Sequence, residues 1–189
     1  MPGIPLFDES RPYQQIPFQY SLHTQESKNG KLEHYSYLAQ SNSSIDPRKD
    51  LIEQMIQDTK GAKTIFVYYI TFERGRIEEM CRDFPEYSKE LESIIERLKD
   101  LIIPFKQKLY RTETMNGSSS IKKVLPALCP DLSYDNLEIG EGMAASYAFL
   151  DLYTCNDQQE IAHTRENLLQ YCHLDTYAMV KILDILQKA

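Results

Sequence analysis

The sequence predicts an α/β domain in which helices flank a small mixed β-sheet. Two segments typical of strands, 18–25 and 32–40, lie on either side of the turn dipeptide Asn29-Gly30. A continuous apolar run at 64–70, rich in β-branched and aromatic residues, is typical of a further strand. Helical patterns follow this run, and the longest of them lies at the carboxyl end of the sequence.

Composition and length indicate an ordinary globular protein. The 189 residues are 42% hydrophobic and 26% charged, which suffices for one buried core, and we expect one domain over 1–189. Lys and Arg number 21 against 28 Asp and Glu, so the net charge is −7. A broad basic surface for nucleic acid is therefore not expected, whereas a local groove or a metal-assisted site for a nucleic-acid end is compatible with this balance.

Compartment and redox state follow from what the sequence lacks. No apolar run approaches the length of a membrane span, and the first residues do not resemble a secretory signal. We therefore expect a cytoplasmic protein that does not contact a membrane. A zinc site from Cys155, His163, Cys172 and His173 fits no common spacing, so free thiols are expected.

The elements are justified in chain order. Residues 1–16 are punctuated by prolines and are expected to form irregular coil. Asp46-Pro47 predicts a helix start, with Asp as the N-cap and Pro in the first helical position. The run 64–70 is expected to be a strand buried on both faces. Further helices are expected over 71–82, 85–98, 142–152 and 159–187, with a short one after 118–120.

The last helix contains the most informative pattern. Its apolar stripe repeats at alternating steps of three and four residues: Leu168, Cys172, Met179, Ile182 and Leu186. Asp175 takes the missing place in this series. A carboxylate inside an apolar stripe needs a partner, a metal or a proton, and Tyr171 lies one turn earlier. The spacing is equally compatible with Asp175 capping a helix that restarts at Thr176, or with a position at the rim of the stripe.

Other candidate residues lie near the apolar strand. Glu73 follows that strand closely, and ligand sites in open α/β sheets collect at the carboxyl ends of strands. Local sequence alone favours a simpler role for Glu73, which is to complement the dipole of its helix. Arg74 and Arg76 are candidates for phosphate contacts, although exposed surface is their default role. Asp100 is a candidate to support a metal ligand, with a role in a turn or helix end as the favoured alternative.

Two short motifs resemble the DEDD exonucleases of the Tyr-containing subclass. The spacing Tyr171-x-x-x-Asp175 on a carboxyl-terminal helix looks like their third motif. The segment from Tyr69 to Glu73 lies where their second motif places Asn-x-x-Phe-Asp. Longer segments resemble an uncharacterised bacterial family, domain of unknown function 2779, which often lies C-terminal to a RecB-like nuclease. Those segments are 11–23, 120–128 and 169–176.

The resemblance implies an RNase H-like fold with a two-metal nuclease site. Four carboxylates would hold two Mg²⁺ or Mn²⁺ ions, which are hard cations that prefer oxygen ligands. Glu73 would be the second-motif acid, Asp175 the third-motif acid and Tyr171 the residue that orients the attacking water. Such a domain would act as a 3′–5′ exonuclease on DNA or RNA ends.

The departures from this pattern predict an incomplete site. Tyr69 and Glu73 replace the usual Asn and Asp, and the first motif, Asp-x-Glu on the first strand of the fold, is missing from the sequence. We expect an amino-terminally truncated chain that is inactive or nearly so, either as a fragment or as a natural remnant. The missing strand would leave unpaired backbone groups, which points to a homodimer. The alternative function is a non-catalytic docking or scaffold domain that partners a RecB-like nuclease.

Overall fold

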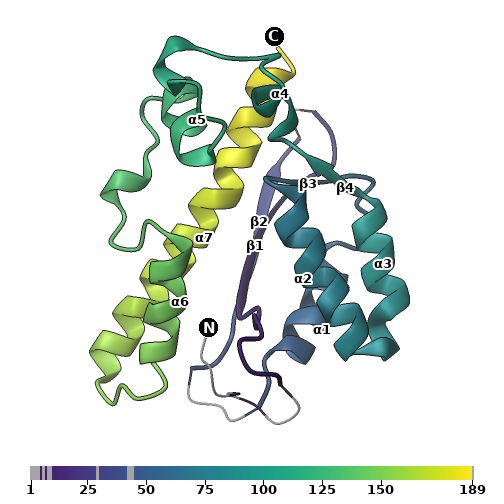
Figure 1. The fold of residues 1–189 in the computed structure, drawn as a ribbon, viewed down its shortest axis with the longest axis vertical. Helices are drawn as coiled ribbons and strands as arrows, with labels where there is room; N and C mark the ends of the chain where they lie inside the picture. Colours follow the sequence, from purple (N-terminus) through teal and green to yellow (C-terminus); the bar gives the residue numbers. More distant parts are fainter. Residues whose placement is uncertain (1–4, 6, 8–9, 29, 42–44, 189) are drawn as a thin grey trace.

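The computed structural model describes residues 5, 7, 10–28, 30–41 and 45–188, and it is a mixed α/β fold (Figure 1). The strands are β1 (Gln19–Gln25), β2 (Leu32–Leu38), β3 (Ile65–Val67) and β4 (Leu98–Asp100). The α-helices are α1 (Arg48–Asp58), α2 (Ile70–Asp83), α3 (Ser88–Glu96), α4 (Ile103–Lys106), α5 (Ile121–Leu128), α6 (Gly142–Asp151) and α7 (Gln158–Leu186). Short 3₁₀ turns cover Pro85–Tyr87, Glu113–Met115 and Tyr134–Asn136.

The strands do not form the single mixed sheet that the sequence predicts. Within the described residues, β1 and β2 form an antiparallel pair, and β3 and β4 form a separate parallel pair. Among the residues that the structure describes, each strand is therefore paired along one edge only. The β1–β2 hairpin runs between α7 on one side and the group of α1, α2 and α3 on the other (Figure 1).

The apolar run at 64–70 behaves differently from the prediction. Only Ile65–Val67 is strand, and Phe66 is 38% exposed, so the expectation of burial on both faces was wrong. The strand ends early because the backbone N–H groups of Tyr69 and Ile70 donate to the Asp100 carboxylate, and α2 begins at Ile70. Leu98, expected at the end of a helix, instead begins β4 and pairs with Ile65. That pairing joins segments far apart in sequence, which local periodicity does not report.

Turns and termini show smaller corrections. The hairpin connection spans 26–31, and Asn29 of the predicted turn dipeptide lies outside the described residues. Helix α1 begins one residue later than predicted, with Pro47 as N-cap, although the Asp46 carboxylate still accepts the Arg48 N–H at 2.9 Å. The described part of 1–16 contains no helix or strand, as expected.

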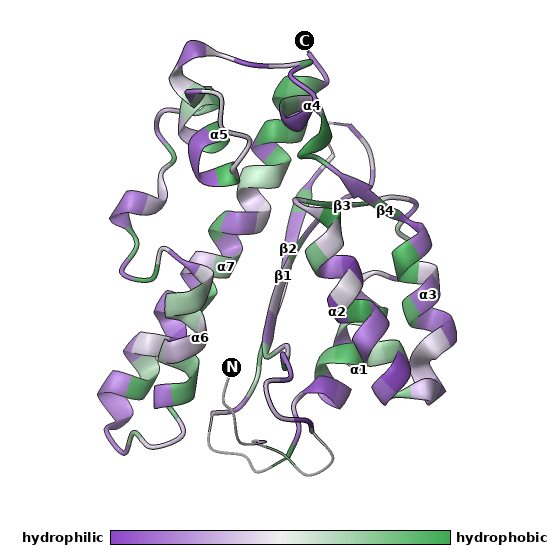
Figure 2. Ribbon diagram, viewed as in Figure 1, coloured by the Kyte–Doolittle hydropathy of each residue, from purple (hydrophilic) through white to green (hydrophobic). Residues whose placement is uncertain are grey.

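The buried residues form one core around α1–α3 and others along α7. The first core contains residues of α1, β3, α2, α3 and β4. The predicted stripe of α7 is confirmed at Leu168 and Ile182, which are fully buried against α6 and α5 respectively. Figure 2 shows apolar and polar patches alternating along α7, as expected for a helix with one buried face. Among the described helices, none is both long and apolar enough to cross a membrane.

Candidate functional site

A cavity of about 460 Å³ lies between the start of β1 and helices α2, α6 and α7. Apolar side chains such as Phe18, Met80 and Phe149 form most of its wall. It opens partly to solvent, so it is a pocket in the surface and not a void sealed inside the core. Its volume falls in the range of ligand-binding sites.

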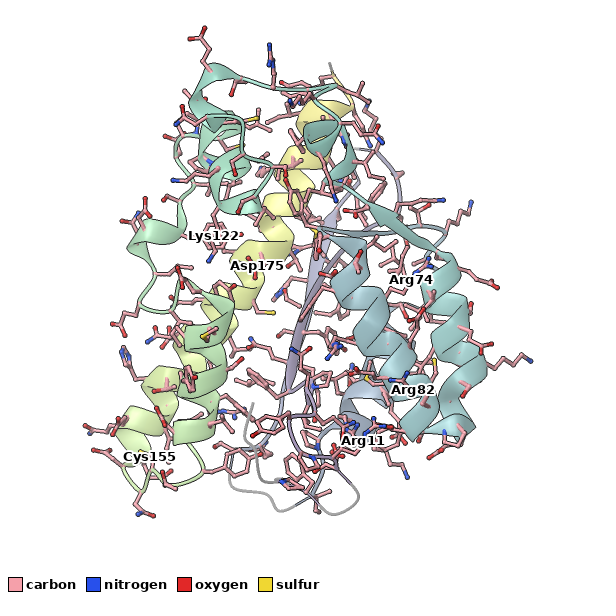
Figure 3. The ribbon with its side chains drawn as sticks, viewed as in Figure 1. Arg11, Arg74, Arg82, Lys122, Cys155 and Asp175 are labelled. Carbon is pink, nitrogen blue, oxygen red and sulfur yellow. The ribbon has the colours of Figure 1, made fainter. Side chains whose placement is uncertain are left out.

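The cavity brings together the two acids that the sequence singles out. Glu73 reaches it from α2, and Asp175 reaches it from the middle of α7, where Figure 3 labels the side chain. Tyr171 lines the same cavity. Within the described residues, Glu73 and Asp175 are its carboxylates, and the charge of Asp175 contributes to raising the pKa of Glu73.

Asp175 is held by phenols in an apolar setting. The Tyr134 hydroxyl donates a hydrogen bond of 2.7 Å to Oδ1 of Asp175, and the Tyr171 phenol lies close enough to this carboxylate to act against the rise of its pKa. Burial raises the pKa of Asp175, and the two phenols and the Lys122 charge only partly oppose it. The alternative of a helix restarting at Thr176 is wrong, because α7 is continuous from Gln158 to Leu186. No sequence pattern signals Tyr134, which comes from the 3₁₀ turn Tyr134–Asn136, 41 residues away.

Glu73 is the most electrostatically perturbed acid of the cavity. Its Oε2 is buried and has no hydrogen-bond partner. Burial, followed by the charges of Asp100 and Asp175, raises the pKa of Glu73 to about 7 although its own backbone N–H acts in the opposite direction. Glu73 also lies in the first turn of α2, so the helix-dipole role holds alongside any role in the cavity.

Asp100 organises the backbone beside Glu73. Its carboxylate accepts hydrogen bonds from the N–H groups of Tyr69, Ile70 and Ile102 at 2.9–3.0 Å. This confirms the turn and helix-end role for Asp100. Tyr69 has a left-handed backbone with φ of 79°, a conformation that costs free energy in a non-glycine residue, and the bonds to Asp100 hold it there. Its ring is 49% exposed, with the Lys106 ammonium 5.9 Å from the centroid.

The two arginines of α2 lie in different settings. Arg76 forms an ion pair of 3.0 Å with Glu79, bonds to Gln15 and lies 5.7 Å from the centre of the Phe72 ring. Its guanidinium is therefore engaged within the protein, although its Nε is buried without a partner. Arg74 is exposed on α2 (Figure 3).

Comparison with known proteins places the chain in a family. A family model described as "Domain of unknown function (DUF2779)" matches residues 1–120, more than half of the chain. The chain belongs to the DUF2779 family. The "Uncharacterized protein MG366 homolog" of Mycoplasma pneumoniae is 30% identical over 199 aligned residues. That alignment covers 95% of this chain but only 30% of the relative, and no solved structure matches.

The family match and the candidate site overlap only in part. The DUF2779 match includes Glu73, Tyr69 and Asp100, whereas Tyr171 and Asp175 lie beyond its last residue. The structure nevertheless brings α2 and α7 to the same cavity. The site of this DUF2779 chain is therefore built from both the matched part and the carboxyl-terminal helix.

The carboxylate oxygens of the cavity are ligands of the type that divalent cations prefer, but they are too few for a two-metal centre. Carboxylates are the ligands that Mg²⁺ and Mn²⁺ prefer, and the unpartnered Oε2 of Glu73 is available to one. Two carboxylates are fewer than a two-metal centre needs, and Asp100 is committed to backbone N–H groups. In the described part of the chain, the one group of three potential metal ligands is a histidine cluster, which sequence reasoning missed: His23, His34 and His173.

Proposed function

We propose that this DUF2779 chain is a DEDDy-like 3′–5′ exonuclease-type domain with an RNase H-like fold, acting on DNA or RNA ends. The observation that supports the proposal is the meeting of Glu73, Asp175 and Tyr171 in one cavity from two helices far apart in sequence. The resemblance of the segments around these residues to the second and third exonuclease motifs supports the same assignment. A cytoplasmic location belongs to the same proposal.

The roles of the residues follow from their surroundings. Glu73 and Asp175 would hold Mg²⁺ or Mn²⁺ through their oxygens, and a bound cation would also favour the ionised form of Glu73. When bound, such an ion supplies an activated water and stabilises the leaving oxygen of a phosphodiester. Tyr171, whose phenol lies beside Asp175, would orient the attacking water.

The site requires carboxylates in addition to these two. We propose that they arrive on an extended segment that fills the apolar cavity beside β1. The edge of β1 opposite β2 has no strand partner among the described residues, so a segment there would gain backbone hydrogen bonds. Without that segment, the 189-residue chain should be inactive or nearly so.

The test uses 5′-end-labelled single-stranded DNA and RNA with Mn²⁺. The 189-residue chain is compared with a longer chain that continues upstream of Met1 in the genome. The longer chain should trim 3′ ends, and Asp175→Asn or Glu73→Gln should reduce the rate at least 100-fold. Glu166→Gln, at an exposed acid of α7, is the matched control and should leave the rate unchanged. Trimming that survives Asp175→Asn would contradict the proposal.

A second candidate is a non-catalytic docking domain that partners a RecB-like nuclease. The observation that favours it is the combination of an apolar cavity and strands paired along one edge, which suits the capture of a partner's strand. In a homodimer, the same strand edges would pair with a second copy of this chain instead of a nuclease partner. Light scattering would report a dimer, and a pull-down that shows no binding to the nuclease at micromolar concentration would count against the docking function.

A further inference from the structure

Three of the four histidines of the chain meet where the β1–β2 hairpin packs on α7. His23 and His34 are direct cross-strand partners, and His173 lies on α7. The ring centroids are 4.6 Å apart for His23 and His34, 4.9 Å for His23 and His173, and 4.6 Å for His34 and His173. One potential ligand nitrogen from each ring lies within 4.8 Å of those of the other two.

The strand register places two of these histidines on the face toward α7. Side chains alternate between the two faces of a strand. Tyr20 stacks with Tyr37 and packs against the core around α1. Ser21 and His23 instead contact Thr176 of α7. A slip of one residue would move His23 to the opposite face, so the cluster depends on this register.

A chain of hydroxyl groups sets the orientation of two of the imidazoles. The Thr176 hydroxyl lies 3.2 Å from the backbone carbonyl of His173, 2.7 Å from Ser21 Oγ and 2.9 Å from His23 Nδ1, all within hydrogen-bond distance. Ser21 Oγ is in turn hydrogen-bonded to His34 Nε2 at 2.9 Å. With protons on Nδ1 of His23 and Nε2 of His34, tautomers that this network accommodates, Nε2 of His23 and Nδ1 of His34 would each keep a lone pair for a metal. Histidines that bind metals commonly have their other ring nitrogen held in this way.

The electrostatic setting also suits neutral imidazoles. Burial, followed by the charges of His34 and His173, lowers the pKa of His23 to about 4. Burial and His173 lower the pKa of His34 as well. Among ion pairs between described residues, none joins an acid to this cluster. Neutral rings with available lone pairs are the form in which histidine binds metals.

We propose that His23, His34 and His173 bind a divalent transition-metal ion such as Zn²⁺, which joins the hairpin to α7. Imidazole nitrogen suits Zn²⁺, Ni²⁺ or Cu²⁺ rather than Mg²⁺. Zn–N bonds of about 2.0–2.1 Å require tetrahedral ligand nitrogens about 3.4 Å apart, so the side chains would rotate to shorten separations that are now within 4.8 Å by up to about 1.4 Å. Three protein ligands leave a fourth position for water or another ligand.

This site is separate from the carboxylate cavity and does not depend on the proposed nuclease function. His173 and Asp175 are two positions apart on α7, which places them about 200° apart around the helix. The cation classes also differ, because the cavity offers carboxylate oxygens and the cluster offers imidazole nitrogens. If one site failed to bind its ion, that result would therefore not show whether the other site binds its own ion.

The test is calorimetric titration of the untagged, chelator-treated 189-residue chain with Zn²⁺. One Zn²⁺ should bind per chain, and His34→Gln and His23→Gln should each weaken binding at least tenfold. His163→Gln is the matched control, since this fourth histidine is exposed on α7 and pairs with Glu138 at 2.8 Å. The control should bind within twofold of wild type, and excess Mg²⁺ should not compete.

A second measurement separates the histidines from the four free cysteines. The Co²⁺ complex should show no thiolate charge-transfer band. Circular dichroism verifies that each variant is folded. If His23→Gln does not fold, the affinity of His34→Gln, a substitution at an exposed strand position, decides the test. Unchanged affinity in His34→Gln, a thiolate band, or no binding at micromolar Zn²⁺ would each overturn the proposal and leave the cluster as ring packing only.

Discussion

Glu73→Gln should remove a pH-dependent loss of stability from the metal-free protein. Glu73 ionises at about 4.5 under ordinary conditions, whereas in the folded chain its pKa is raised to about 7. The unfolded chain therefore releases this proton at lower pH than the folded chain does. The free energy of unfolding should fall as pH rises from about 4.5 to about 7 and then level off. Gln has the same shape and cannot ionise, so the variant lacks this contribution.

The expected magnitude follows from the pKa. A pKa difference of one corresponds to 1.36 kcal/mol, so the rise from about 4.5 to about 7 corresponds to about 3.4 kcal/mol at most. Residual solvent access to the half-buried side chain reduces this, and we expect about 2 to 3 kcal/mol. The variant should match wild type near pH 4.5 and should be more stable by that amount at pH 8.

Urea unfolding monitored by circular dichroism at several pH values from 4.5 to 8, in the presence of a chelator, measures the difference. Glu78→Gln, at an exposed acid on the same helix, is the control and should show a small difference that does not change with pH. A difference for Glu73→Gln that is constant across the range, or a less stable variant at pH 8, would refute the reasoning about this carboxyl.

Three further substitutions test the surroundings of the site. Asp100→Ala leaves three backbone N–H groups without their acceptor and should cost about 1–3 kcal/mol in urea unfolding, whereas an unchanged midpoint would contradict the capping role. Tyr134→Phe removes a hydrogen bond that lowers the pKa of Asp175, so carboxyl titration by NMR should show this pKa rising further; a fall would be inconsistent with the geometry. Leu168→Ala, at a fully buried position between α7 and α6, should cost about 2–5 kcal/mol, and a loss below 1 kcal/mol would mean that the two helices pack loosely.

Local sequence patterns were sufficient for the elements whose signal is periodic. The stripe through Leu168 and Ile182 predicts α7 to within one residue at each end, because a helix with one buried face repeats its apolar residues every three or four positions. The alternation and turn residues around positions 18–40 likewise predict the hairpin. The apolar stripe also singled out Asp175, since a carboxylate in a buried series needs a partner.

Tertiary packing decided the features that join segments distant in sequence. The pairing of Leu98 with Ile65 turned an expected helix end into β4, and the strands formed two ladders instead of one sheet. Tyr134 bonds to Asp175, and His23 meets His173, across 41 and 150 residues respectively. A single sequence records which face of each element avoids water. It does not record which faces meet, because that depends on how the elements pack against one another.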